Sequence, residues 1–240
     1  MVYGAAGAMG GAVARAFARE GATVFLAGRT LAKLDVVAEE IRATGGAAET
    51  AEVDALDQQA VEEHADEMVK RAGRIDISFN AISITEVQNV PLVELSLEEF
   101  MTPVTEAART HFITATTAAK RMTAQGAGVI VMLSSSAARE SRHRMGGFNL
   151  ACAAIEAFTR SLAGEVGRQG VRVVALRPNF TPETAPGVPV EALQPLVKDT
   201  LLGRLPRLAE VAGAAVFAAS EQGGAMTGAV VNLTCGAIVD

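Results

Sequence analysis

The sequence predicts one α/β domain, built on a doubly wound, seven-stranded parallel sheet with helices on both faces. A glycine-rich turn near the start joins an apolar lead-in to a helical pattern, and short apolar runs then alternate with helical periods along the chain. No linker or charged block divides the 240 residues. Uninterrupted alternation of strands and helices produces a parallel sheet that is covered on both faces, and this length suits a single domain.

The first stretch has the pattern of a strand, a glycine turn and a helix. Val2 and Tyr3 lead into the small residues 4–10, and Val13 and Phe17 lie on one face of the helix that follows. Glycines let a backbone approach a ligand without a Cβ, and the free N–H groups of a helix N-terminus attract negative charge. The stretch indicates a phosphate cradle for a dinucleotide, although a plain tight turn explains it equally well. Because so few residues precede the turn, we expect the natural chain to begin further upstream.

The later elements follow in order. Further strands are expected where short apolar runs end at turn residues, at 23–27, 48–53, 75–81, 128–133, 171–176 and 229–233. Helices are expected where apolar residues recur every three or four positions, at 31–44, 57–72, 147–166 and 208–220. Glycines close several of these periods, as helix ends commonly do.

Two segments depart from this regular alternation. Ser96 and Glu99 form a capping box that opens a helix running to about Met122, and Pro103 should kink this helix or restart it with Thr102 as a new cap. Residues 181–205, the lid segment, are rich in proline and have no clean period. Long segments of this kind are typical of lids and binding loops, so we expect this one to cover a substrate.

Composition excludes several classes of function. The net charge of −6 argues against nucleic acid or an anionic membrane as partner, because both favour a basic patch. The apolar runs are too short to span a bilayer. Cys152 and Cys235 are lone thiols without metal-ligand spacing, so we expect no metal site and no disulfide. We expect a soluble, cytoplasmic protein that binds a small molecule.

Chemistry-bearing residues recur where the expected strands end, at residues 4–10, Arg29, Asp54, Asn80, 134–136 and Pro178. In doubly wound sheets, ligands bind outside the carboxyl ends of the strands, at the point where strand order reverses. The sequence therefore predicts one site at this edge of the sheet.

These residues resemble the motifs of the short-chain dehydrogenase/reductases over nearly the whole chain. Residues 3–10 are similar to the family's TGxxxGxG, with Ala8 at the middle glycine, and Asp54-Ala55 is similar to its DV pair. Residues 80–83 correspond to NNAG, Pro178-Asn179 to PG, and residues 227–233 to the tGxxlxvdGG ending. The resemblance implies a Rossmann-like domain over residues 1–240 whose cofactor contacts are Gly4, Ala6, Gly7, Met9, Gly10, Arg29, Asp54, Ala55, Asn80, Ala81, Pro178 and Thr181.

Arg29 predicts which nicotinamide cofactor is used. It follows the second strand, where NAD-dependent members tend to carry an acidic residue that accepts from the ribose 2′-hydroxyl. An arginine at this position would pair with a 2′-phosphate instead, although a solvated surface arginine is the simpler alternative. NADP(H) is therefore favoured over NAD(H).

The resemblance is weakest at the catalytic centre. The family's S-x12-Y-x3-K motif starts at Ser135, but Phe148 lies at the tyrosine position and Cys152 at the lysine position. The helix asparagine is replaced by Ala107. A phenylalanine has no proton to transfer, and a cysteine is not a cation at neutral pH. We expect an atypical centre in which Ser135 polarises the substrate and Cys152 is a small buried residue.

Two histidines are candidates to supply the missing proton. His143 lies between Ser135 and Phe148, and His111 lies one helical turn after Ala107. An imidazole in water has a pKa suited to acid catalysis. The alternatives are a solvated loop residue for His143 and a helix-packing residue for His111.

Three hypotheses about function remain open at this stage. The first is an NADP(H)-dependent oxidoreductase with an atypical centre that acts on a small apolar molecule. The second is a catalytically silent ligand-binding protein or partner subunit, and the third is a non-redox enzyme that reuses the pocket. The resemblance also implies a homodimer or homotetramer, formed through the helices at about 100–122 and 147–166.

Overall fold

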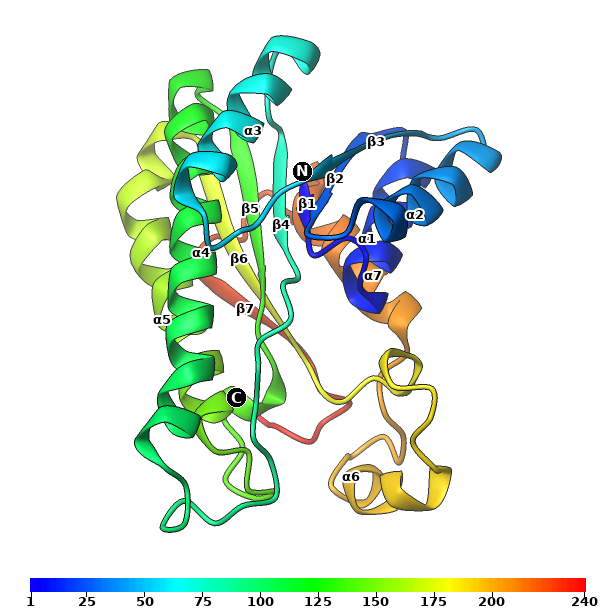
Figure 1. Ribbon diagram of the computed structural model, residues 1–240, viewed down its shortest axis with the longest axis vertical. Coiled ribbons are helices and arrows are strands. Elements are labelled where there is room, and N and C mark those ends of the chain that lie inside the picture. Colours follow the sequence, from blue (N-terminus) through cyan, green and yellow to red (C-terminus); the bar gives the residue numbers. More distant parts are fainter.

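A parallel sheet of seven strands forms the centre of the computed structural model, which describes residues 1–240 (Figure 1). The strands are β1 (Val2–Tyr3), β2 (Thr23–Gly28), β3 (Ala47–Glu52), β4 (Ile77–Asn80), β5 (Gly128–Leu133), β6 (Val171–Pro178) and β7 (Ala229–Leu233). Their order is β3-β2-β1-β4-β5-β6-β7, and all neighbouring pairs are parallel. The predicted fold class is confirmed.

Helices cover both faces of the sheet. On one face lie α1 (Ala8–Arg19), α2 (Leu31–Ala43) and α7 (Leu208–Ala219), and on the other lie α3 (Gln58–Ala72), α4 (Leu97–Gln125) and α5 (Gly147–Val166) (Figure 1). The strand β5 shows how the two apolar cores arise. Ile130 and Met132 pack on the α4 side, whereas Val129 and Val131 pack on the α1 side, because successive side chains of a strand point to opposite faces.

Strand order reverses between β1 and β4, which are neighbours in the sheet. The chain leaves β1 to build one half of the sheet and returns at β4 to build the other. The turns after these two strands therefore flank the crevice in which such sheets bind ligands.

The long helix α4 differs from the expectation at one point. The capping box is present, since the Ser96 hydroxyl accepts from the Glu99 N–H at 3.2 Å and the Ser96 N–H donates to the Glu99 carboxylate at 2.8 Å. The helix then continues through Pro103 without restarting, so the prediction of a new cap at Thr102 is wrong. The Thr102 hydroxyl donates to the Glu98 carbonyl instead, as a residue inside a helix does.

The lid segment has more regular structure than its sequence suggests. It contains single turns of 3-10 helix at Pro182–Thr184 and Val190–Leu193, followed by the short helix α6 (Gln194–Lys198). Its first turn packs against α1 and α7. None of the helices combines the length and the apolarity needed to cross a lipid bilayer.

Candidate cofactor and substrate site

The turn between β1 and α1 leaves no room for side chains at two of its glycines. Gly4 has a φ of 74°, and a Cβ there would run into the carbonyl oxygen of Ala81 at the end of β4. A Cβ on Gly10 would run into the carbonyl oxygen of Gly4. Gly7 caps α1, and the N–H groups of the first helical turn have no partners within the helix. The turn fits a pyrophosphate group for these reasons.

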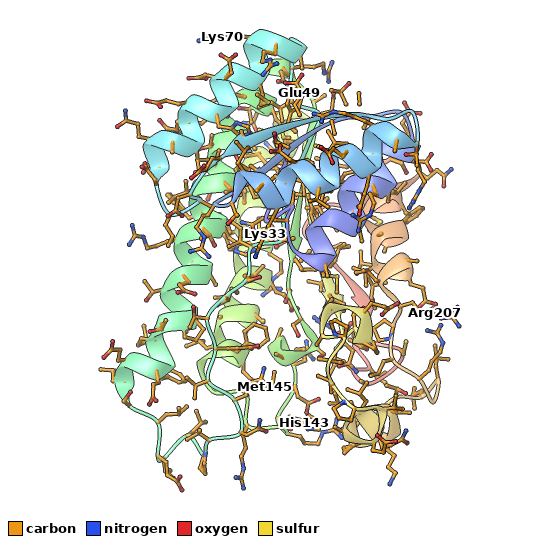
Figure 2. The ribbon with its side chains drawn as sticks, turned by 45° about the vertical axis from the view of Figure 1, so that its right-hand side comes forward. Lys33, Glu49, Lys70, His143, Met145 and Arg207 are labelled. Carbon is orange, nitrogen blue, oxygen red and sulfur yellow. The ribbon has the colours of Figure 1, made fainter.

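Two cations lie beside this turn at the end of β2. Arg29 is exposed, and its side chain forms no hydrogen bond or ion pair. The same holds for the side chain of Lys33, in the first turn of α2 (Figure 2). Asp54, at the end of β3, is also exposed, and one of its carboxylate oxygens accepts from the Leu56 N–H at 3.0 Å. Ala55 is buried beside it. The ends of β2 and β3 thus present two cations, Arg29 and Lys33, and two carboxylates, Glu52 and Asp54, to solvent.

Asn80, expected at the cofactor, forms two hydrogen bonds within the protein at the end of β4. Its side-chain amide donates to the Thr114 hydroxyl on α4 at 2.9 Å, and its oxygen accepts from the Ile82 N–H at 3.0 Å. The residue is buried, so these partners occupy its side chain. Asn80 therefore holds the turn after β4 in place, and Ala81 supplies the backbone that meets Gly4.

Ser135 begins the 3-10 turn that follows β5. Its hydroxyl oxygen accepts from the Ala137 N–H at 3.3 Å, which leaves the hydroxyl proton free to be donated. The serines on either side of it form hydrogen bonds inside the protein. Ser134 donates to the carboxylate of Glu156 at 3.1 Å, and Ser136 donates to the side chain of Asn179 at 3.2 Å.

Phe148 and Cys152 lie one turn apart at the start of α5. Phe148 is half-buried, whereas Cys152 is almost completely buried. Burial raises the pKa of the Cys152 thiol, and the Glu86 and Glu156 carboxylates raise it further. The thiol is therefore neutral at physiological pH and is a poor nucleophile.

Both candidate histidines have partners other than Ser135. His111 is 2% exposed, and its Nδ1 lies 3.0 Å from the Ala107 carbonyl oxygen. Burial lowers the pKa of His111 to about 4, which keeps the ring neutral. The Nε2 of His143 lies 3.0 Å from the Asp199 carboxylate in the lid segment. Neither imidazole forms a hydrogen bond with Ser135.

Two further residues expected at the cofactor, Pro178 and Thr181, lie at and just after the end of β6. Pro178 is buried in the strand, and the buried Thr181 hydroxyl donates to the Asn179 carbonyl at 3.2 Å. The Asn179 side-chain oxygen in turn accepts from the Phe180 N–H at 2.7 Å. This turn leads the chain from the sheet into the lid segment.

Comparisons with known proteins agree with this geometry. A family model described as enoyl-(acyl carrier protein) reductase matches residues 4–237. The short-chain reductase protein NovJ of Streptomyces niveus is 32% identical over 98% of this chain and 92% of its own length. The chain belongs to the short-chain dehydrogenase/reductase family. Gluconate 5-dehydrogenase of Gluconobacter oxydans is 30% identical over 100% of this chain and 94% of its own.

Solved structures of the family have the same fold. A short-chain type dehydrogenase/reductase from Mycobacterium marinum superimposes with a TM-score of 0.89 at 28% identity, covering 100% of this chain and 94% of its own. Family membership makes this chain an oxidoreductase-type protein whose fold implies a nicotinamide cofactor. The glycine turn described above fits that cofactor's pyrophosphate.

Sequence reasoning about this family member missed a buried ion pair beneath the site. Arg177, on β6, donates to both carboxylate oxygens of Glu156, on α5, at 2.7 and 2.8 Å. A third donor of Arg177 reaches the Asp240 side chain at 2.6 Å. These hydrogen bonds raise the pKa of Arg177. A glutamate one turn after Cys152 on a mostly apolar helix, together with an arginine inside an apolar strand, is the signal that could have found the pair.

Proposed function

We propose that this protein is an NADP(H)-dependent oxidoreductase with an atypical catalytic centre that acts on a small apolar molecule. The observation that carries the proposal is the glycine turn against β4, where no Cβ fits at Gly4 or Gly10, next to the unpaired guanidinium of Arg29. The turn would hold the pyrophosphate, and Arg29 would pair with the 2′-phosphate. The cofactor, when bound, supplies or accepts a hydride.

The preference for NADP(H) is supported by the charges at the end of β2. Gly28 ends the strand, so no carboxylate from that position competes for the ribose or repels a 2′-phosphate. Arg29 and Lys33 are both free of acidic partners. A hydrogen-bonded charge pair of this kind is worth about 1.5–3 kcal/mol, which corresponds to about 10- to 100-fold in affinity.

The centre is atypical because its residues cannot move a proton as the family's tyrosine does. Ser135 keeps a free hydroxyl proton and would polarise a substrate oxygen or nitrogen. Phe148 offers an apolar face, and the neutral, buried Cys152 cannot act as a cation. A positioned general acid contributes about 10²- to 10⁴-fold in rate, so the substrate should need little acid assistance. An iminium needs only the hydride, and an activated alkene takes the hydride at one carbon and a proton from water at the other, so both meet this requirement.

A second function is favoured by the same two residues. With Phe148 and Cys152 at the centre, the protein would bind nucleotide or a small ligand without turnover, or would serve as the silent subunit of a larger assembly. A non-redox enzyme that reuses the pocket belongs to the same alternative. The two functions differ in whether bound NADPH is ever consumed.

Self-association through α4 and α5 is part of the proposal. Phe112 on α4 is 55% exposed, and its ring lies 6.2 Å from that of Phe158 on α5. Leu97 and Met101 are exposed on the same α4 helix, and Leu150 is exposed on α5. An exposed apolar patch on two long helices supports a homodimer or a homotetramer.

A calorimetric titration with NADPH and with NADH tests the cofactor proposal. We expect NADPH to bind about 10- to 100-fold more tightly than NADH. The substitution Arg29→Ser should remove this preference while leaving NADH binding unchanged. Arg168→Ser, at an exposed arginine in the turn between α5 and β6, is the matched control and should change neither affinity. Failure of both nucleotides to bind would refute the proposed cofactor.

A substrate screen then separates the two candidate functions. Oxidation of NADPH by an activated alkene or imine, without reaction of ordinary ketones, would support the atypical oxidoreductase. If nothing in such a panel consumes bound NADPH, the silent protein is the better description. The double substitution Phe148→Tyr and Cys152→Lys should create ketone reductase activity if the rest of the pocket is intact.

A further inference from the structure

The lid segment is fastened to the rest of the protein at few points. Near its start, the Glu183 carboxylate accepts from the first N–H of α7 at 3.2 Å. Near its end, the Leu202 N–H donates to a carbonyl after β7 at 3.1 Å, and the Arg204 guanidinium donates to both carboxylate oxygens of Glu210 on α7 at 2.7 and 2.8 Å. Between these points, the side chains of residues 184–198 form no hydrogen bond or ion pair with residues outside the segment. The next side chain, that of Asp199, is the exception.

Asp199 receives two donors from a single loop. The Nη1 of Arg142 lies 2.8 Å from one carboxylate oxygen of Asp199, and the Nε2 of His143 lies 3.0 Å from the other. Both donors belong to the loop at residues 139–146, which leads from β5 into α5, and Figure 2 shows His143 next to the lid segment. One carboxylate thus connects two segments that are 56 residues apart in sequence.

The loop that carries the two donors is itself fixed to the site. The Glu140 carboxylate accepts from the Nε of Arg142 at 3.0 Å, which holds the guanidinium in place. The side chain of Asn149 donates to the carbonyl of Glu140 at 2.6 Å and to that of Ala137 at 2.9 Å. Because Asn149 directly follows Phe148 on α5, the loop is anchored beside the candidate catalytic residues.

The backbone of this loop is held in a conformation that its residues rarely adopt. His143 has a φ of 64° and Arg144 a φ of 44°. Both values lie in the left-handed region, which residues other than glycine rarely adopt. Such conformations persist only where the surrounding contacts hold them. Here the Asp199 contacts act on one side, and the Asn89 N–H donates to the Arg144 carbonyl at 2.9 Å on the other.

We propose that Arg142, His143 and Asp199 form a latch that holds the lid segment closed over the candidate site. The lid segment starts against α1, at the phosphate cradle, and the latch fastens it to the opposite rim, beside Phe148. Ligand exchange requires the part between Ala185 and Lys198 to lift, and breaking the latch frees it. The latch acts in the same way whichever cofactor or substrate occupies the site.

Hydrogen exchange of the protein without added ligand, followed by mass spectrometry, tests the latch directly. Asp199→Asn should raise the exchange rate of peptides within residues 185–198 by up to about fivefold, the factor that a partly exposed ion pair contributes. Glu191→Gln is the matched control, because Glu191 lies in the same segment and its side chain has no hydrogen-bond or ion-pair partner. Peptides of β5 serve as the internal reference, and their exchange should not change in either variant.

Arg142→Gln should reproduce the effect of Asp199→Asn, and the double variant should exchange no faster than Asp199→Asn alone, because both remove the same contact. Equal exchange in Asp199→Asn and Glu191→Gln would overturn the latch, as would fully additive effects of the two latch substitutions. Because no nucleotide is present, this result is independent of the NADPH titration. Trypsin cleavage after Lys198 provides a second readout and should accelerate in Arg142→Gln but not in Glu191→Gln.

Discussion

Individual residues show how burial changes the chemistry of groups that look functional in the sequence. His111 is an example, because it was a candidate acid but is a buried residue of α4. His64 is also buried, with its ring edge-on to that of Tyr3 at 6.2 Å. In both histidines the Nε2 has no hydrogen-bond partner, and burial lowers the pKa to about 4. Both rings therefore stay neutral in the folded protein.

These lowered pKa values predict how stability depends on pH. An unfolded histidine titrates near pH 6.5, so between about pH 6.5 and 4 the unfolded chain binds protons that the folded chain does not. Above about pH 6.5, the burial of neutral His111 costs no proton-binding free energy. Below that pH, the free energy of unfolding decreases because of His111, by about 2 kcal/mol between pH 7 and 5. Urea denaturation at the two pH values should show that His111→Gln loses this part of the decrease. An unchanged decrease in the variant would assign it to other groups.

The buried pair of Glu156 and Arg177 differs from the histidines, because both residues have hydrogen-bond partners for their charged groups. Here burial is matched by partners, since the guanidinium uses three donors and the carboxylate also accepts from Ser134. Charges can lie inside a protein when they are paired and hydrogen-bonded in this way. The pair joins the middle of α5 to the ends of β5 and β6, and Ser135 directly follows the serine that bonds to Glu156.

At the scale of elements, the start of α5 is set by its contact with α4. Gly146 has a φ of 57°, and a Cβ on Gly147 would run into the Phe100 carbonyl oxygen. Since Phe148 follows at once, this close approach positions the candidate centre. The two helices can meet here only because the first residue of α5 has no side chain.

Two glycines of α5 provide a matched test of that contact. Gly147→Ala should destabilise the protein by about 1–3 kcal/mol, because the added methyl has no space. Gly164 lies in the same helix, and no atom comes within 4 Å of the place that a methyl group on it would take. Gly164→Ala should therefore stabilise by about 0.5–1 kcal/mol, through helix propensity. Thermal unfolding of both variants measures the two changes in stability. Similar changes at the two positions would show that the close contact between α5 and α4 is not needed for stability.

At the scale of the whole molecule, the proposed self-association predicts where a charge is tolerated. Phe112 on α4 and Val36 on α2 are both 55% exposed, so they are equally accessible in the single chain. Phe112→Glu should reduce the mass measured by light scattering to that of one chain, because it buries a charge in the proposed α4–α5 interface. Val36→Glu should leave the mass unchanged. Equal masses for Phe112→Glu and the wild type would exclude this surface as the interface.

The architecture was predictable because the patterns that specify it are local. The two-residue period of β5 places alternate side chains on the two faces, and the Ser96–Glu99 capping box needs residues only three apart. The positions of Gly4 and Arg29 after their strands were equally visible. The prediction of a break at Pro103 was wrong. Proline removes one backbone hydrogen bond of α4, but packing against the sheet and α5 keeps the helix continuous.

By itself, the sequence determined the alternation of strands and helices, the glycine turn, and the order of Ser135, Phe148 and Cys152 along the chain. The tertiary structure alone decided that the Asn80 amide is occupied by Thr114, that Glu156 pairs with Arg177, and that Asp199 fastens the lid segment to His143. These pairs lie 34, 21 and 56 residues apart. Periodicity describes which face a residue occupies, but only the packed chain brings such distant side chains within hydrogen-bonding distance, and burial then sets their protonation.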